Sequence, residues 1–326
     1  MTHVLVIRLS AFGDVALVAP VLKEVAQANP AVQFTMAAPP LLEPLFDGLP
    51  NVSFLGVKKH QPTVDIYRQL KSVEADTVAD LHQVNRVGHA LLLLRLNSLL
   101  NFHPLKIRRI HKGRLSRWLF LHHLYMKPRK SQAERYADVF RHLGLSVPLQ
   151  TNTQILNHTS TQPHTIGIAP FAQHRGKIWP LENTCRLALL LAQRGYRVFL
   201  FGSQDEAQQL EALAAQHENI ESLAGKQSFA EELIIMQNLN LMVSMDSANM
   251  HFASAVGTRV VSVWGATHPD FGFYGYHQNR ANALYSSLPC HPCSAYGNRR
   301  CRYGDYRCLT AITPEQVMHK IEEALL

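Results

Sequence analysis

Residues 241–256 read LMVSMDSANMHFASAV, and this stretch decides the fold. Its apolar start, within Leu239–Ser244, predicts a buried strand, and Ser247–Val256 predicts a helix that ends before Gly257. A polar turn with Asp246 joins the two. A strand that leads directly into a helix is the repeating step of a parallel sheet with helices on its faces.

The same alternation continues through the second half of the chain. Further apolar runs and amphipathic stretches predict strands at 166–169, 197–201 and 260–264, a helix at 182–194 and a last helix at 314–326. We therefore expect one α/β domain over 165–312, closed by a C-terminal helix over 313–326.

The first half follows the same plan. Strands are predicted at 3–9, 32–38, 51–55 and 76–81, and a helix from Asp14 carries Val15, Val18, Leu22 and Val25 on one face. This predicts a domain over 1–156, followed by a polar linker over 157–164. The fold class is α/β, with two Rossmann-like domains that we expect to face a central cleft. Ligands should bind there, at the carboxyl ends of the strands.

The composition is that of a folded protein with excess positive charge. Hydrophobic residues make up 47% and charged residues 17%, which excludes a wholly disordered chain, and the net charge of +8 favours anionic partners. Arg108, Arg109 and Lys112 stand in a basic run that is either a solvated face or a surface for an anionic acceptor or membrane headgroups. With no secretory signal pattern and no apolar run of about 20 residues, we expect a cytoplasmic location, with peripheral membrane contact left open.

Three segments carry side chains suited to chemistry. In 241–256, the start of the predicted helix has small residues that let a diphosphate approach the unpaired N–H groups, and Asp246 and His251 are candidate partners of a bound sugar. A helix with an Asp or Ser cap and a core histidine is an equally good interpretation. In Ala169–Pro180, Lys177 either neutralises phosphate or is an ordinary exposed lysine.

The third segment, Arg8–Asp14, reads RLSAFGD and follows the first predicted strand. Ser10 and Gly13 form the turn, and Asp14 is either a general base for an attacking hydroxyl or a helix cap. Neither a Walker loop nor a G-x-G-x-x-G fingerprint occurs in the sequence.

Four of the five cysteines lie late in the chain, at Cys290, Cys293, Cys301 and Cys308. The first two have zinc-ligand spacing, while the later spacings are not those of a common zinc ribbon. The cluster is therefore either a structural metal site or a set of reduced thiols packed in a loop.

Taken together, the three segments resemble glycosyltransferase family 9, the lipopolysaccharide heptosyltransferases. RLSAFGD resembles the family's R-x-S-x-x-G-D opening, APFAQHRGKIWP its K-x-W-P loop, and DSANMH its D-[ST]-G-x-x-H signature. The cysteine pattern also resembles the family's C-terminal part. The resemblance implies a GT-B fold and inverting transfer of a sugar, in the family a heptose from ADP-heptose, to lipopolysaccharide core, without a catalytic metal or a further cofactor.

Carried over to this sequence, the resemblance implies that Asp14 is the base and that Lys177 holds the donor diphosphate. It implies donor contacts for the remaining matched positions Gln173, Glu206, Asp246, Ser247, Ala248, Asn249 and His251. Two positions depart from the pattern: Ala248 replaces the usual glycine and narrows the approach to phosphate, and Gln173 is bulkier than the usual Ser or Thr. Glycosyl transfer is therefore better supported than the identity of the donor.

Two alternatives differ in class. A nucleotide-sugar epimerase would have the same fold but would need no acceptor. The basic first domain argues against this alternative. A non-enzymatic protein that binds nucleic acid or another anion would explain the charge, but the basic run lacks a recognition motif, so we expect no nucleic-acid partner.

Overall fold

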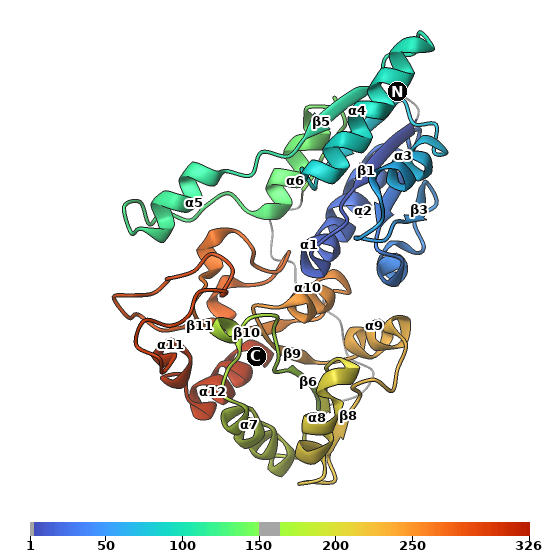
Figure 1. The fold of residues 1–326 in the computed structure, drawn as a ribbon. Helices are drawn as coiled ribbons and strands as arrows, with labels where there is room; N and C mark the ends of the chain where they lie inside the picture. The colour runs from blue at the N-terminus through green and yellow to red at the C-terminus, as the bar shows by residue number, and fades with distance from the viewer. Residues whose placement is uncertain (1–2, 150–163) are drawn as a thin grey trace. The chain divides into compact units, whose positions relative to one another are not determined.

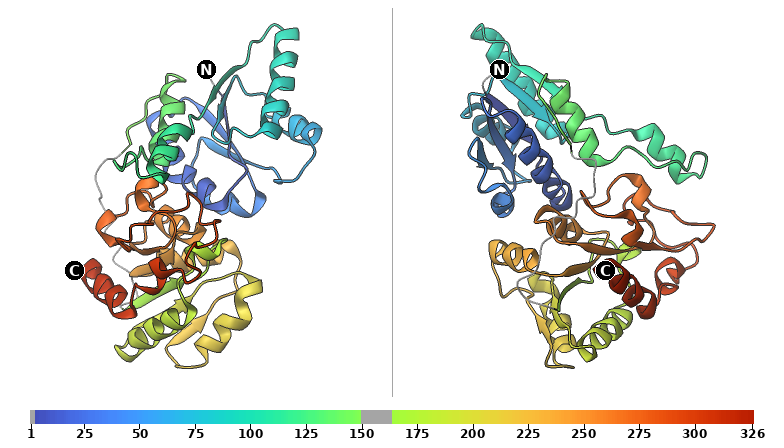
Figure 2. Two further views of the ribbon diagram at one scale, coloured as in Figure 1. Left: turned by 60° about the vertical axis from the view of Figure 1, so that its left-hand side comes forward. Right: turned by 180° about the vertical axis from the view of Figure 1, so that it is seen from behind.

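The computed structural model describes residues 3–149 and 164–326, which fold as two units. The first unit comprises Met1–Lys112 and Gln132–Gln150, and the second comprises Gly113–Ser131 and Thr151–Leu326. Each has a parallel sheet with helices on both faces (Figure 1, Figure 2). Two Rossmann-like α/β units were predicted, and this part of the prediction is confirmed.

The sheet of the first unit has the strand order β3-β2-β1-β4-β5, and all of its neighbouring strands are parallel. The strand order reverses between β1 and β4. In open α/β sheets ligands bind at such a point, in the crevice beside the carboxyl ends of the two strands. The strands are β1 (His3–Ile7), β2 (Gln33–Ala38), β3 (Val52–Gly56), β4 (Thr77–Asp80) and β5 (Lys106–Arg109).

The sheet of the second unit has the order β11-β10-β9-β6-β7-β8, again parallel throughout. If the strands of this unit are numbered 1 to 6 from β6 to β11 and the sheet is followed from the β8 edge, the order is 3-2-1-4-5-6. This is the strand order of the Rossmann fold, with the reversal between β6 and β9. The strands are β6 (Thr165–Ala169), β7 (Arg197–Leu200), β8 (Ile220–Ser222), β9 (Leu241–Met245), β10 (Val260–Trp264) and β11 (Ala283–Tyr285).

The helical face predicted after β1 is buried as expected. Val15, Val18, Leu22 and Val25 have no exposed surface, although the helix starts earlier than predicted and is divided at Leu17. On the opposite face of the sheet, Leu5 and Ile7 pack in one core cluster with residues of α3 and α4. The helices of this unit are α1 (Phe12–Ala16), α2 (Val18–Ala28), α3 (Thr63–Lys71), α4 (Asn85–Leu100) and α6 (Gln132–Arg141), with a 3-10 helix η1 (Pro40–Phe46).

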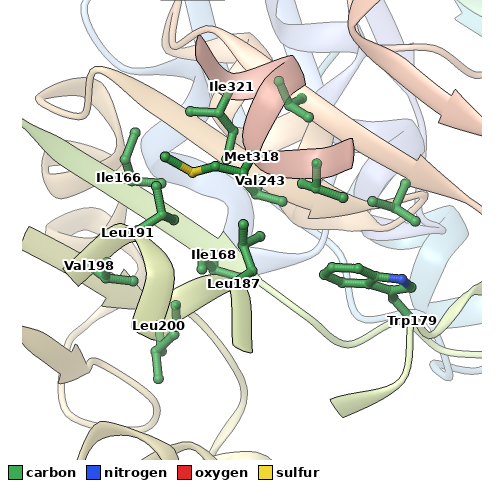
Figure 3. Packing of buried hydrophobic residues seen from close by; sticks show 14 of the residues in the cluster. Ile166, Ile168, Trp179, Leu187, Leu191, Val198, Leu200, Val243, Met318 and Ile321 are labelled. Carbon is green, nitrogen blue, oxygen red and sulfur yellow. The ribbon is translucent and has the colours of Figure 1, made fainter. Parts of the chain in front are cut away.

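The core of the second unit joins its sheet to the C-terminal helix. Figure 3 shows Met318 and Ile321 of that helix packed with Ile166, Val243 and Leu191, while Trp179 closes one end of the cluster. Residues 313–326 thus belong to the core of the second domain rather than standing beside it. The helices are α5 (Arg114–Leu121), α7 (Leu181–Gln193), α8 (Ala207–Ala214), α9 (Phe229–Gln237), α10 (Ala248–Ala255), α11 (Arg307–Thr310) and α12 (Pro314–Leu325), with short 3-10 helices η2 (Arg175–Lys177), η3 (Gln204–Glu206), η4 (Pro269–Phe271) and η5 (Arg280–Asn282).

The division into units differs from the predicted boundaries most clearly at residues 113–131. A single first domain over 1–156 was expected, but residues 113–131 group with the second unit. The reason is that this segment contacts residues of the second unit that are distant in sequence. The Arg129 backbone N–H donates to the carbonyl of Asp270 at 3.0 Å, and the Arg129 guanidinium donates to the carbonyl of Phe271 at 3.0 Å. The ring centroids of Phe120 and Phe271 lie 4.9 Å apart. Of the predicted linker 157–164, all but His164 lies outside the described residues.

Candidate functional site

The reversal point of the second sheet holds a buried ion pair. Lys177 Nζ lies 2.8 Å from Asp246 Oδ2, with side-chain exposures of 17% and 8%. The Thr267 hydroxyl donates to the same oxygen at 2.7 Å. Lys177 follows β6 and Asp246 follows β9, which are paired neighbours in the sheet. Two residues predicted from separate motifs are thus in direct contact, at the edge where a Rossmann sheet binds ligands.

The turn that carries Lys177 is held by close approach of three glycines. The Ala266 N–H donates to the carbonyl oxygen of Gly176 at 2.7 Å. A Cβ atom at Gly265 would lie only 2.4 Å from that same oxygen. A Cβ atom at Gly297, where φ is +76°, would lie 2.5 Å from Cγ of Lys177. The absence of side chains at these positions lets the lysine turn pack against the strand end and fixes the direction of the amine.

The start of α10 lies directly after Asp246. Ser247 is its N-cap residue but makes no side-chain cap hydrogen bond in the structure, and its Oγ lies 3.2 Å from Oγ of Ser244. The Ser247 side chain therefore leaves the first N–H groups of the helix available as hydrogen-bond donors. The helix dipole also places partial positive charge there. The alternative that Ser247 caps this helix with its hydroxyl is not supported. An uncapped helix start beside a half-buried lysine is a suitable site for an anion.

The reversal point of the first sheet centres on Asp14. Asp14 is the third residue of α1, and its Oδ2 accepts a hydrogen bond from the Arg8 guanidinium and, at 3.4 Å, from the Ala11 N–H. Arg8 is 8% exposed and donates to the carbonyl of Leu81 at 2.7 Å. Asp14 therefore caps its helix and also holds a buried cation. The contact with the Ala11 N–H is the one that the alternative of a helix cap expects, while the role as a base is compatible with this geometry and stays a prediction.

The electrostatics of this cluster keep Arg8 charged. Burial by itself would lower the pKa of Arg8, but Tyr136 and Asp14 raise it above its ordinary value. The Tyr136 hydroxyl donates to the backbone carbonyl of Asp14 at 3.1 Å, and its ring centroid lies 5.9 Å from the guanidinium carbon.

A model of one protein family matches most of this chain. Residues 64–303 match the family described as "Glycosyltransferase family 9 (heptosyltransferase)". The chain belongs to glycosyltransferase family 9. The match contains the Lys177 loop and the Asp246 signature, which the structure brings together.

Individual relatives agree with this family membership. The chain is 30% identical over 178 residues to lipopolysaccharide heptosyltransferase 2 of Escherichia coli K12, a match that covers 51% of this chain and 48% of that protein. The chain thus spans about half the length of the curated relatives it matches first.

Two solved structures share its fold. A family 9 glycosyl transferase from Veillonella parvula superposes with a TM-score of 0.72 at 21% identity, covering 99% of this chain and 97% of that one. The E. coli heptosyltransferase WaaC, solved with ADP, superposes with a TM-score of 0.70 at 22% identity, covering 99% and 100%. The fold of this family 9 chain is therefore of the GT-B type.

Sequence reasoning missed two residues of the first cluster, Asp80 and His82. Asp80 is fully buried at the end of β4, where its Oδ1 accepts from the N–H groups of His82 and Gln83 at 3.0 and 2.8 Å. The imidazole of His82 lies with Nε2 3.0 Å from Ser10 Oγ. Polar residues immediately after an apolar strand, here DLHQ, are the signal that would have found them, because they stand at the ligand-binding edge.

The three basic residues predicted to bind an acceptor lie around this cluster. Arg109 Nε lies 3.3 Å from Asp80 Oδ2, and Lys112 Nζ donates to the carbonyl of Gln83 at 2.8 Å. Arg108 lies on the same strand, and its Nε donates to the carbonyl of His142 at 3.4 Å. Arg109 and Lys112 thus place positive charge beside residues 80–83, and their role toward an acceptor stays a prediction.

The remaining predicted donor residues are spread over the same edge of the second unit. Glu206 is held by its own loop, because its Oε2 accepts from the Ser203 N–H at 2.7 Å in a capping box. Gln173 is exposed, Ala248 and Asn249 are half-buried, and His251 is buried in the first turns of α10. These placements are compatible with donor binding but do not test it.

The four late cysteines are free thiols. Burial, with a further contribution from the thiols of Cys293, Cys301 and Cys290, raises the pKa of Cys308 to about 11. Within residues 3–149 and 164–326, no group of three or more His, Cys, Asp or Glu side chains is arranged to hold a metal ion. The zinc hypothesis gains no support from this arrangement.

Gly265→Ala tests the packing that holds the lysine turn. Its Cβ would meet a backbone oxygen at 2.4 Å, so the turn must shift, and we expect the free energy of unfolding to fall by about 1–3 kcal/mol. Gly88→Ala is the control, because a Cβ there meets nothing closer than 3.8 Å. The measurement is urea unfolding of both variants. Equal stability of Gly265→Ala and the unmodified protein would contradict the close approach.

The stability of the first cluster should depend on pH through His82. Burial lowers the pKa of His82 to about 3, and its Nδ1 is buried without a hydrogen-bond partner among the described residues. The unfolded chain takes up this proton near pH 6.5 and the folded chain only near pH 3, so stability is complete above pH 6.5 and falls as the pH decreases. Between pH 6.5 and pH 5 we expect His82 to account for a loss of roughly 2 kcal/mol.

Urea unfolding at pH 7.5 and pH 5 measures this effect. His82→Gln should lessen the difference between the two pH values, while His60→Gln, which replaces an exposed histidine of the same unit, should leave it unchanged. An unaltered pH dependence in His82→Gln would refute the assignment.

Proposed function

We propose that this family 9 chain transfers a sugar from a nucleotide-diphosphate donor to a glycan, with ADP-heptose as the favoured donor and lipopolysaccharide core as the favoured acceptor. The family membership supports glycosyl transfer. The names of the relatives support a heptose donor and a lipopolysaccharide acceptor, and the structure of WaaC with ADP supports adenine as the base of the nucleotide.

One observation carries the proposal, namely that Lys177 is held by Asp246 at the uncapped start of α10. The lysine ammonium uses one of its three N–H groups for Asp246 and has the others for a phosphate oxygen, and the start of α10 supplies further N–H donors, so a bound diphosphate receives hydrogen bonds from two sides. These groups can stabilise a leaving nucleoside diphosphate without a metal ion. Asp246 and Thr267 act here by fixing the amine, and a contact of Asp246 with the sugar is a second role within the same proposal.

The reaction is a single in-line displacement. A hydroxyl oxygen of the acceptor forms a bond to the anomeric carbon of the donor sugar, and the bond from that carbon to the diphosphate oxygen breaks with inversion. The nucleoside diphosphate leaves with the bonding electron pair, and Asp14 takes the hydroxyl proton. Because a free sugar hydroxyl is a very weak acid, proton transfer to Asp14 takes place only as the new carbon–oxygen bond makes the hydroxyl acidic.

The proposal is tested by binding first and by turnover second. Thermal-shift titrations with ADP, GDP, UDP and dTDP, and with a generic duplex DNA, should give a shift for ADP; ligand at 100 times Kd stabilises the folded state by about 2.7 kcal/mol. Mass spectrometry of ADP-heptose incubated with deacylated core oligosaccharide should then show an acceptor heavier by one heptose. A shift with DNA and none with any nucleoside diphosphate would sink the proposal.

A further inference from the structure

Helix α4 is apolar on two opposite sides. Val87, Ala90, Leu91 and Leu94 are buried against the first sheet. On its other side the helix exposes leucines at i, i+4, i+7 and i+8, with exposed fractions of 55% at Leu92, 50% at Leu96, 54% at Leu99 and 80% at Leu100. At 100° per residue these four positions form one continuous stripe. Figure 1 shows α4 on the outside of the first unit, beside α3.

Two more exposed apolar side chains extend this stripe. Leu93 is 39% exposed, and Phe102, just past the end of the helix, is 92% exposed. We call the six residues Leu92, Leu93, Leu96, Leu99, Leu100 and Phe102 the α4 face. Single exposed leucines are normal on a soluble protein, but a contiguous apolar stripe on one helix marks a surface that binds a partner or a membrane.

The charged side chains of α4 itself are all basic. Between Asp80 and Glu134 the sequence contains no Asp or Glu, and the part within the first unit carries six basic residues, Arg86, Arg95, Lys106, Arg108, Arg109 and Lys112. Arg95 lies on α4 itself, exposed and one turn from both Leu92 and Leu99. An apolar stripe with basic and no acidic side chains on the same helix is the pattern of helices that lie in the interface of an anionic bilayer.

We propose that the α4 face docks on the surface of a membrane that contains anionic lipid. Its leucines and Phe102 would enter the boundary between headgroups and acyl chains, and the exposed Arg95 among the leucines would contact the phosphates. A second copy of the chain fits less well, because it would place two positive surfaces together. Nucleic acid would match the charge but would leave the leucines in water. No helix in the described part of the chain is long and apolar enough to cross a membrane, which is consistent with docking on the surface.

This inference does not require the proposed transfer reaction, because it concerns binding to lipid without donor or acceptor. It adds a partner to that function, since a lipid-linked acceptor is presented at such a surface. Vesicle binding and nucleotide binding can therefore fail independently of each other.

Co-sedimentation of the full chain with vesicles tests the proposal. Vesicles of phosphatidylcholine with 30% phosphatidylglycerol should bind the protein, and vesicles of phosphatidylcholine alone should bind it at least fivefold less. Binding should weaken as NaCl is raised from 0.05 to 0.5 M, because salt screens the charge contribution. Leu96→Gln/Leu100→Gln should lower the partition coefficient at least tenfold, since it removes two side chains that would leave water.

The matched control is Leu41→Gln/Ile234→Gln, which replaces two equally exposed apolar residues outside α4, 53% and 59% exposed, and should bind vesicles like the unmodified chain. Circular dichroism and the melting temperature establish that both double variants fold. Equal loss in the control, undiminished binding of Leu96→Gln/Leu100→Gln, or indifference to phosphatidylglycerol would each overturn the proposal. So would light scattering that shows a dimer without vesicles and a monomer for the α4 variant, because the occupant would then be a second copy.

Discussion

Asp14→Asn is expected to lower kcat for sugar transfer by on the order of 10²–10⁴, the range for loss of a positioned general base. The substitution keeps the size of the side chain and one acceptor oxygen for the Ala11 N–H, but it removes the basic carboxylate. The affinity for ADP should not change, because the predicted diphosphate site lies in the other unit. Transfer rates at saturating donor and acceptor, with ADP binding measured separately, check both expectations.

Loss of charge at Asp14 also leaves Arg8 buried without its carboxylate, so a structural effect must be separated from a chemical one. Asp65→Asn is the control, because Asp65 also stands in the first turn of a helix and pairs with an arginine, Arg68, at the surface. Urea unfolding measures the stability of each variant. A variant Asp14→Asn that is folded at the assay temperature and retains more than a third of kcat would show that Asp14 is not the base.

Lys177→Met is expected to weaken ADP binding by roughly 10- to 100-fold, which corresponds to loss of one charge-assisted hydrogen bond of about 1.5–3 kcal/mol. The methionine retains most of the apolar stem that packs at Gly297. Isothermal titration with ADP and with adenosine distinguishes the contribution of the phosphates: adenosine affinity should be unchanged. Lys226→Met is the control, because Lys226 forms a surface ion pair with Glu211 in the same unit.

The same substitution leaves Asp246 buried without its cation, which is expected to destabilise the second unit. The double variant Lys177→Met/Asp246→Asn removes that uncompensated charge, so its stability should recover partly while its ADP affinity stays low. Recovery of ADP affinity in the double variant would mean that Lys177 acts only by neutralising Asp246, and the donor site would then have to be placed elsewhere.

The sequence by itself determined many elements of both units, although the short strands β5, β8 and β11 were not predicted. The buried residues Val15, Val18, Leu22 and Val25 lie on the successive helices α1 and α2, and the apolar run 260–264 lies within one strand, so these patterns are local and can be read from the sequence. The sequence also predicted where the motifs lie in the fold, because the carboxyl ends of parallel strands meet at one edge of a sheet. Both reversal points therefore contain residues predicted from the sequence, Asp14 in the first and Lys177 with Asp246 in the second.

Only the tertiary structure decided how these side chains are paired. The contact of Lys177 with Asp246, the hydrogen bond of Arg8 to Leu81 and the placement of His82 beside Ser10 all cross between strands that are neighbours only through the strand order. The grouping of residues 113–131 with the second unit likewise depends on Arg129 and its distant partners. Periodicity records which face of an element is buried, but it carries no information about which element will cover that face. The packing of the whole chain decides which elements meet. This packing brings side chains from separate motifs together in two polar clusters.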